Sequence, residues 1–492
     1  MLRFFRDHPA PAGVQAPEEP DRPVLTCSNS SFMNRLFIAF VCTVAALGGL
    51  LFGYDTAVIS GAIGYMSRHF GMTPALEGWT SSSVLLGCAV GAGSAGFVSD
   101  RIGRKRALLV SAICFFASSL GTALAPTLGA FVAFRILGGL GIGSASIISP
   151  MYIAEITPAP IRGKMVTLNQ FAIVTGMLLV YFVNYFIAGQ GTEEWNQTDG
   201  WRWMFGSGAI PSFFLLVSLL FIPETPRWIA LHARDGVERA RRIMVRIGGE
   251  AYAREELRGI EMSVDSSSSP LAELLVKPFR AVFILGIALA ILQQVTGINV
   301  FLYYGPEIFR SIVQGTQTDA ALLQTVVIGA CNMIFTVVAF ATVDRVGRRP
   351  LMLVGTAGMC LALVSMGVAA FMGRTEGWLL AFILIYIASF ALAVGPVTWV
   401  ILSEIFPTRM RGTAMAIATV CLWIANYGVS QTFPMLDKST LLVDLFHHAF
   451  PFWVYAAFCV VLFILVLARI PETRGKSLEE IERLWHHRGT SV

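Results

Sequence analysis

Charged residues are scarce in this chain. Only 14% of its 492 residues are Asp, Glu, Lys or Arg, whereas 55% are hydrophobic. A soluble protein of this length needs far more polar surface, so the composition indicates a polytopic membrane protein. The net charge of +5 is small for such a length and gives no support to nucleic-acid binding.

Residues that hold metals, cofactors or disulfides are also few. The 7 histidines lie in predicted loops, tails or span ends, and all but one of the 8 cysteines lie within predicted spans. This pattern predicts no metal centre, no haem and no disulfide framework. The chain has no Gly-X-X-X-X-Gly-Lys-Ser/Thr phosphate loop and no nucleophile–base constellation inside a span. We therefore expect neither an enzyme, nor a cofactor, nor direct use of ATP.

Long apolar runs dominate instead. Twelve stretches are long enough to cross a bilayer as helices, which takes about 20 apolar residues each. The sequence thus predicts an all-α polytopic membrane protein with two six-helix bundles, over residues 36–222 and 279–470. A polar tail is expected at each end, over residues 1–35 and 471–492. The polar linker, residues 223–278, is expected to form short amphipathic helices around Glu238–Gly259. The twelve predicted spans lie near residues 36–66, 79–99, 107–125, 128–154, 165–188, 202–222, 279–309, 320–343, 351–372, 378–403, 412–433 and 449–470.

Basic residues are concentrated in the short loops on one side. One tight loop holds Arg101, Arg104, Lys105 and Arg106, whereas an opposite loop is acidic around Glu193. The positive-inside rule then predicts a cell-membrane protein with both termini in the cytoplasm. Residues 1–35 lack a short apolar stretch ending in a cleavage site, so we expect a cytoplasmic tail rather than a secretory signal.

Three charged motifs occur twice in the same order. Glu155-Ile-X-Pro-X-X-X-Arg-Gly recurs at Glu404, 249 residues later, and Asp100-Arg-X-Gly-Arg recurs at Asp344, 244 residues later. Pro223-Glu-Thr recurs 248 residues later. The chain therefore consists of two copies of one unit. In an apolar chain this duplication is typical of a secondary transporter with its pathway between the halves.

These motifs predict a latch on the cytoplasmic side. Carboxylates and guanidiniums at helix ends can pair in one state of a transporter and separate in another. The alternative is positive-inside anchoring with surface pairs worth ~0–1 kcal/mol each, but this leaves the matched Glu155 and Glu404 unexplained. The residues assigned to the latch are Asp100, Arg104, Glu155, Arg162, Glu224, Arg227, Asp344, Arg348, Glu404, Arg411 and Glu472.

The repeated motifs resemble those of sugar porters of the major facilitator superfamily, over about residues 36–485. Longer stretches are most similar to the proton-coupled xylose symporters of that family: Leu50–Gly61, Ser149–Glu155, Asn169–Ile173 and Gln293–Asn299. The resemblance implies the twelve-helix major facilitator fold, a monosaccharide and a proton as ligands, and a bilayer as surroundings. The positions of the charged residues can be explained without a partner subunit, so we expect the protein to function as a monomer.

A single acidic residue, Asp55, is predicted deep within a span, and Arg135 is the one deep basic residue. An unneeded carboxylate at that depth costs several kcal/mol, so Asp55 is a functional candidate. Counted from their span ends, both residues lie about 10–17 Å below the outer face, so we expect them to pair. Opening and closing of the pair would change proton affinity through a transport cycle. The alternative is a static ion pair that fixes span 1 to span 4. The resemblance implies proton coupling, because proton-coupled relatives carry Asp here and animal facilitators carry Asn.

Neutral amides and aromatic rings provide a candidate sugar site. Amides match sugar hydroxyls in both hydrogen-bond senses, and Trp offers an apolar surface for the ring. The resemblance implies that Gln170, Gln293, Gln294, Asn299 and Trp399 are direct ligands and that Asn332 and Trp423 line the cavity; Tyr303 is a further aromatic candidate. The alternative for each amide is an interhelical hydrogen bond.

On a straight helix, the amide side chains of span 7 cannot all point in the same direction. Gln294 and Asn299 would lie about 140° apart. We therefore expect a helix break at Gly297 or Pro306, and a similar break at Gly395-Pro396 beside Trp399.

Three positions depart from the xylose symporters: Met177 and Leu422 replace Gln, and Gly208 replaces Glu. Fewer polar partners predict a more apolar pocket that favours a larger or differently oriented ring, such as glucose or galactose. The sequence predicts a proton-coupled symporter that imports a pentose or hexose (D-xylose, D-glucose or D-galactose class) by alternating access. The alternatives are a sugar uniporter with the same pocket and a transporter-like sugar sensor, for which the short tails leave little room.

Overall fold

The computed structural model describes residues 34–262, Leu274, 279–312, 318–373, 378–406, 410–474 and Glu480. Within these residues, 12 helices are long and apolar enough to cross a membrane, six before the linker and six after it. This confirms the predicted number and position of the spans. Most of the two predicted tails lies outside the described residues.

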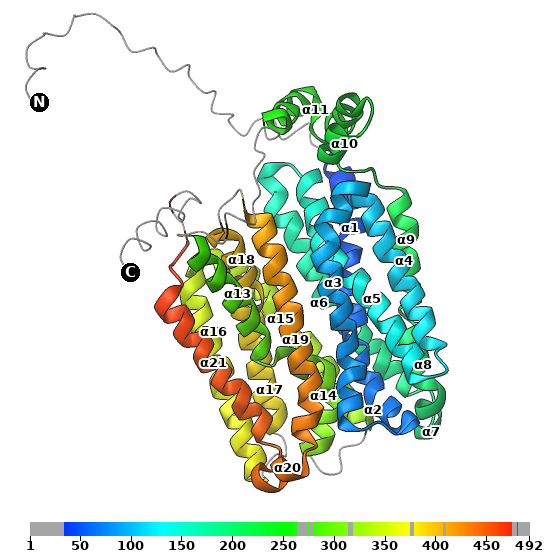
Figure 1. Cartoon of the computed structure of the whole chain (residues 1–492), viewed down its shortest axis with the longest axis vertical. Coiled ribbons are helices and arrows are strands. Elements are labelled where there is room, and N and C mark those ends of the chain that lie inside the picture. Colours follow the sequence, from blue (N-terminus) through cyan, green and yellow to red (C-terminus); the bar gives the residue numbers. More distant parts are fainter. Residues whose placement is uncertain are drawn as a thin grey trace, which may run out of the picture.

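The first half forms one bundle (Figure 1). Its first span consists of α1 and α2, which meet at Val58, and its sixth span contains a π-helical turn, η2. The elements are α1 (Arg35–Ala57), α2 (Ile59–Phe70), α3 (Pro74–Ile102), α4 (Arg104–Ala123), α5 (Leu128–Ile156), α6 (Ala159–Ala188), α7 (Glu193–Trp195), η2 (Asn196–Gly200), α8 (Trp201–Gly206) and α9 (Ala209–Leu220).

The second half forms the other bundle, on the left in Figure 1. Two of its spans are interrupted, one between α13 and α14 and one by the π-helical segment η3. The elements are α13 (Phe279–Val295), α14 (Ile298–Ile312), α15 (Thr318–Val346), α16 (Arg348–Phe371), α17 (Trp378–Ser389), η3 (Phe390–Val394), α18 (Gly395–Ile405), α19 (Arg411–Asp437), α20 (Thr440–Phe446) and α21 (Phe450–Arg469).

Two further helices cap the first bundle at one end, at the top of Figure 1. They are α10 (Pro226–His232) and α11 (Gly236–Met262), which agrees with the short helices predicted for the linker. We call the end of the molecule that carries α10 and α11 the linker face. The opposite end carries α7 and α20, and we call it the loop face (Figure 1).

Threonine side chains cap the starts of two spans, and α3 begins five residues before its predicted start. The Thr73 side chain accepts a hydrogen bond from Leu76 N at 3.4 Å at the start of α3, and Thr127 does the same for Ala130 N at 3.2 Å at the start of α5. At the linker face, α3 and α15 both stop at the glycine of the repeated Asp-Arg-X-Gly motif. Gly103 and Gly347 have φ of 96° and 102°, a region that favours glycine.

The helices around the centre of the first bundle pack with their backbones nearly touching. A Cβ atom on Gly139 of α5 would collide with the carbonyl of Val84 in α3, and one on Gly53 of α1 would collide with the carbonyl of Ile173 in α6. Small residues allow such close approach where no hydrophobic effect draws helices together in lipid. α1 and α5, which carry Asp55 and Arg135, also pack closely, because a Cβ on Gly48 of α1 would lie 3.7 Å from that of Ala145 in α5.

Candidate functional site

The buried ion pair joins α1 to α5. Arg135 Nη1 lies 3.1 Å from Asp55 Oδ2 and 3.1 Å from the main-chain oxygen of Asp55. The Arg135 side chain is fully buried, that of Asp55 is 10% exposed, and the guanidinium lies 5.4 Å from the centre of the Phe205 ring. The contact predicted from matched depth is therefore present.

Arg135 contacts Asp55 through a single nitrogen. Arg135 Nε and Nη2 are buried and meet no hydrogen-bond partner among the described residues, so one nitrogen makes every polar contact of the guanidinium. Bidentate Arg–carboxylate pairs are the strong form of this interaction. A contact through one nitrogen, which is shared with a main-chain oxygen, is weaker and therefore easier to open.

The amides of span 7 lie together because the helix breaks between them. α13 ends at Val295, Gly297 has φ of 94°, and α14 starts at Ile298. Asn299 Nδ2 then donates to Gln294 Oε1 at 2.5 Å, and Gln294 Nε2 donates to Gln293 Oε1 at 3.3 Å. The expected break at Gly297 is confirmed, and the three amides form one hydrogen-bonded chain.

Gln293 also connects this chain to span 10. Its Nε2 donates to the carbonyl oxygens of Val394 and Gly395, at 3.2 and 3.1 Å. These carbonyls lie where η3 passes into α18, so the break expected at Gly395-Pro396 takes the form of a π-helical segment just before it. Such segments are frequent at functional sites. α18 then carries Trp399.

The remaining sugar-site candidates lie on four further elements. Gln170 on α6 and Trp399 on α18 are half-buried, and neither side chain makes a hydrogen bond among the described residues. Trp423 on α19 is buried against Phe52, with ring centres 5.5 Å apart, and its Nε1 has no partner in the same part of the chain. These polar groups are therefore available to a ligand.

Tyr303 and Asn332 are already engaged. The Tyr303 side chain is buried near that of Asn426, and Asn332 Nδ2 lies 3.9 Å from Met177 Sδ, across the two halves. A sulfur acceptor at that distance is weak, so Asn332 retains most of its capacity to bind a ligand.

The chain was then compared with known proteins. The family model of the sugar (and other) transporters matches residues 41–485. The D-xylose-proton symporter of Escherichia coli K12 is 44% identical over 478 residues, covering 92% of this chain and 96% of that one. This chain belongs to the sugar transporter family. It is no enzyme but a membrane transporter with the major facilitator fold.

Other relatives of the transporter differ in what their names say they carry. The arabinose-proton symporter of Bacillus subtilis is 40% identical, with 95% of this chain and 98% of that one covered. The glucose facilitated diffusion protein of Zymomonas mobilis is 39% identical, with 93% and 99% covered.

Solved structures of one relative match the whole fold. The xylose transporter of E. coli in its inward open conformation superposes with a TM-score of 0.81 at 41% identity, covering 91% of this chain and 100% of that one. The same relative bound to 6-bromo-6-deoxy-D-glucose gives a TM-score of 0.75.

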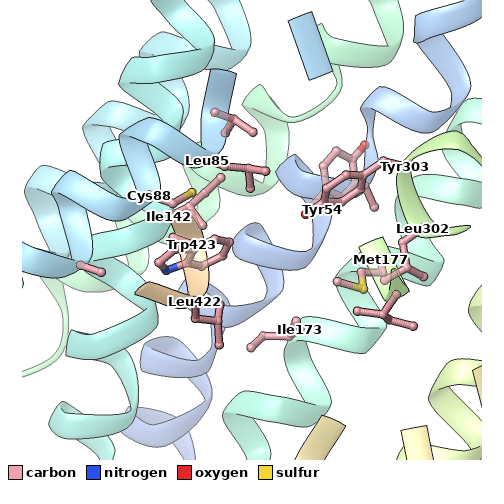
Figure 2. Packing of buried hydrophobic residues seen from close by; sticks show 14 of the residues in the cluster. Tyr54, Leu85, Cys88, Ile142, Ile173, Met177, Leu302, Tyr303, Leu422 and Trp423 are labelled. Atoms are coloured by element: carbon pink, nitrogen blue, oxygen red, sulfur yellow. The ribbon is translucent and has the colours of Figure 1, made fainter. Parts of the chain in front are cut away.

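Two of the three residues that depart from the xylose symporters belong to the buried hydrophobic core. Met177 and Leu422 are buried in the hydrophobic core; Figure 2 shows Leu422 next to Trp423, and Met177 apart from them, near Leu302. At Gly208, a Cβ would lie 2.8 Å from Ser119 Oγ, which leaves little room for a longer side chain in this packing. The more apolar sugar pocket expected from these substitutions remains a prediction.

The loop face of the transporter is closed by contacts between the halves. Glu77 of α3 binds Lys438, just beyond α19, with Nζ–Oε2 2.6 Å, and the Glu77 side chain is only 7% exposed. Gln431 Nε2 donates to the Ala75 carbonyl at 2.9 Å, and the Tyr181 hydroxyl donates to the Leu302 carbonyl at 2.9 Å. Glu77 also accepts a hydrogen bond from the Ser67 hydroxyl.

Sequence reasoning missed the role of Glu77. It lies in the first turn of a helix after Pro74, where an acidic residue is ordinary because it complements the helix dipole. No sequence signal connects it to Lys438, which is 361 residues away.

The predicted latch residues form one charge cluster at the linker face of each half. In the first half, Arg104 Nη2 lies 3.1 Å from Glu155 and Nη1 lies 2.9 Å from Asp100. Glu224 accepts the main-chain N–H of Arg104 at 2.9 Å and of Lys105 at 3.0 Å. Four of the assigned residues therefore meet around Arg104.

The second half repeats this arrangement around Arg348. Its Nη2 lies 3.0 Å from Glu404 and its Nη1 lies 3.0 Å from Asp344. Glu472 accepts the main-chain N–H of Arg348 at 3.0 Å. Partial burial raises the pKa of Glu472, but N–H bonds from Arg474, Arg348 and neighbouring residues outweigh it and hold this pKa below the usual value.

The other assigned arginines contact main-chain groups or solvent. Arg162 Nε donates to the Thr157 carbonyl at 3.3 Å, and Arg411 Nη2 lies 3.5 Å from the Phe406 carbonyl. Arg227 is exposed. The ion pairs around Arg104 and Arg348 therefore join helices within one half, and a connection between the halves here remains a prediction for another conformation.

The contact between His448 and Asp437 at the loop face predicts that the stability of the fold depends on pH. His448 Nδ1 lies 3.1 Å from Asp437 Oδ1, and this hydrogen bond raises the pKa of His448. Because the folded-state pKa lies above the unfolded one, the pair stabilises the fold fully below about pH 6.5 and less as pH rises through the folded-state pKa. Thermal unfolding of purified protein should show His448→Gln to be less stable by about 1–2 °C at pH 6 and equal to wild type at pH 9.

The control for this effect is the same substitution in an Asp437→Asn background. In that background, His448→Gln should cause no pH-dependent loss of thermal stability, because the carboxylate that favours the charged imidazole is gone. An unchanged pH dependence in that background would assign it to another group.

Proposed function

We propose that this chain is a proton-coupled monosaccharide symporter that imports a pentose or hexose by alternating access. The observation that carries the proposal is the buried Asp55, held by Arg135 through a single nitrogen. A carboxylate is retained at such depth where it serves a function, and a weakly held one can exchange its proton. Two relatives whose names state proton symport support the same reading.

α1 supplies the coupling between proton and sugar. Asp55 lies three residues after Phe52, so the two side chains are neighbours on the helix surface. Phe52 packs on Trp423 of the other half, with ring centres 5.5 Å apart. Movement of the halves about a bound sugar would therefore shift α1 and with it the Asp55–Arg135 contact.

In the proposed cycle, the loop face is external and the linker face, with both termini, is cytoplasmic. The sugar enters from the loop face while Asp55 is protonated, the halves rock, and both ligands leave at the linker face. At about 100 mV, one proton moving inward contributes ~2.3 kcal/mol, enough to concentrate sugar roughly fiftyfold. The contacts Glu77–Lys438 and Gln431–Ala75 fit the inward-facing stage of this cycle.

For the substrate, we propose a hexose such as D-glucose or D-galactose alongside or in place of D-xylose. Met177 and Leu422 offer apolar surface where the xylose symporters have amides, and the methylene of the hydroxymethyl group that a hexose adds to the ring can pack against such a surface. We further propose that the transporter acts as a monomer in the cell membrane.

A uniporter with the same pocket is the second candidate. It is favoured by the relative named as a glucose facilitated diffusion protein, which is 39% identical. In that case the Asp55–Arg135 contact would be a static ion pair that joins α1 to α5.

External pH in lightly buffered, energy-depleted cells distinguishes the two. Pulses of xylose, glucose, galactose or arabinose should make the medium alkaline for each transported sugar, because proton and sugar enter together. Uptake of a labelled sugar down its gradient with no pH change would make this chain a uniporter. Cells carrying the empty vector provide the baseline.

A further inference from the structure

A basic cavity lies at the linker face, outside the transport pathway. It has a volume of about 870 Å³ and lies between the ends of α4 and α9 and the linker helices α10 and α11 (Figure 1). A smaller cavity of about 410 Å³ adjoins it and shares Pro223, Arg242 and Ile243 with it. Neither has a role in the proposed transport cycle.

The charge of the larger cavity is strongly positive. Its one acidic residue, Glu224, already accepts main-chain N–H bonds from Arg104 and Lys105, and nearby Glu238 is paired with Arg241 at 3.0 Å. Its four guanidiniums, those of Arg106, Arg234, Arg239 and Arg242, make no ion pair within the described part of the chain. The basic residues that line it are Lys105, Arg106, Arg234, Arg239 and Arg242.

The floor of the cavity is apolar and continues into a bilayer-facing surface. Leu109 of α4 and Leu220 of α9 line it. Beyond them, Ile113 of α4 and Phe214 of α9 are 55% and 61% exposed on a span surface that only lipid tails can cover. The cavity therefore borders water on one side and hydrocarbon on the other.

We propose that this cavity binds the phosphate head group of an anionic glycerophospholipid from the leaflet at the linker face, with its acyl chains along α4 and α9. Several unpaired guanidiniums match a phosphate diester, and basic pockets at span ends are suited to such head groups. The apolar floor and its continuation into the bilayer favour a lipid over a soluble phosphate ester. A bound lipid would fasten α10 and α11 to the first bundle. This inference requires only a membrane-embedded chain, and does not depend on proton coupling or on the identity of the sugar.

Native mass spectrometry of the full chain in detergent tests the proposal, with dioleoylphosphatidylglycerol and dioleoylphosphatidylcholine as probes. The wild type should retain phosphatidylglycerol in preference to phosphatidylcholine. Arg234→Glu with Arg239→Glu should weaken retention of phosphatidylglycerol at least about tenfold, because each basic side chain contributes severalfold to anionic lipid binding. Both residues are exposed, so the fold should tolerate the change. If the double variant nevertheless fails to fold, Arg106→Gln alone should lower retention severalfold.

The matched control is Arg254→Glu with Arg258→Glu, which makes the same charge change on exposed residues of α11 that do not line the cavity. It should retain the lipid as the wild type does. Equal losses in the two double variants, or no loss in either, would overturn the assigned site. Displacement of phosphatidylglycerol by glycerol 3-phosphate at equal concentration would assign the cavity to a soluble phosphate ester and overturn the lipid assignment.

Discussion

Replacing Asp55 with Asn should abolish sugar-driven proton uptake and sugar accumulation while leaving sugar exchange across the membrane intact. Asn cannot take up a proton, so the proton gradient loses its connection to the conformational cycle. The fold should survive, because Arg135 Nη1 also donates to the main-chain oxygen of residue 55, which the substitution keeps. The measurement is sugar-induced alkalinisation of the medium in parallel with counterflow of labelled sugar.

Glu307→Gln is the matched control for this experiment. Glu307 is another carboxylate in a span helix, 3.1 Å from Arg310, and its side chain is 24% exposed near the end of α14. Its neutralisation should leave alkalinisation in place. If Asp55→Asn still accumulates sugar against a gradient, Asp55 is not the coupling group; if it loses counterflow as well, the pair is structural.

Replacing Gln294 with Ala should weaken sugar binding by roughly 10- to 100-fold, the largest effect expected of any amide in the site. Gln294 accepts from Asn299 and donates to Gln293, so its loss removes one ligand and leaves two others without their partner. Each unsatisfied buried polar group costs about 1–3 kcal/mol. Isothermal titration of purified protein with the transported sugar measures the affinity directly.

Asn332→Ala provides the comparison. Asn332 has only a weak contact, 3.9 Å from Met177 Sδ, so its removal disturbs no network and should cost less affinity than removal of Gln294. Thermal unfolding of both variants separates lost binding from lost stability. Similar affinities for Gln294→Ala and wild type would show that the amides of span 7 serve helix packing rather than the sugar.

Much of the site was predictable from local sequence. Gly297 and the opposed amides Gln294 and Asn299 required a helix break, and the break is at Gly297. The depths of Asp55 and Arg135 predicted a contact that is present at 3.1 Å. Both inferences use only the rise and turn of a helix, which are the same in every helix.

The contacts that join distant segments were not predictable. Gln293 donates to Val394 and Gly395, more than 100 residues away, and nothing in either segment indicates the other. In the sequence, Glu77 resembles an ordinary acidic residue at the start of a helix. Only the folded structure places Lys438 beside it.

By itself, the sequence determined that this is a duplicated twelve-span membrane protein with one deep carboxylate, because apolar length, repeated motifs and the cost of a buried charge are local properties. The assignment to the sugar porters came from the resemblance of its motifs to that family. Only the tertiary structure decided that the loop face is closed by Glu77–Lys438, that the charge clusters stay within each half, and that five basic residues from α4, α11 and the turn between α10 and α11 surround one cavity. The rotation and tilt of each helix are set by packing against its neighbours, and the hydrophobic pattern of a span carries little of that information, because lipid and protein interior are equally apolar.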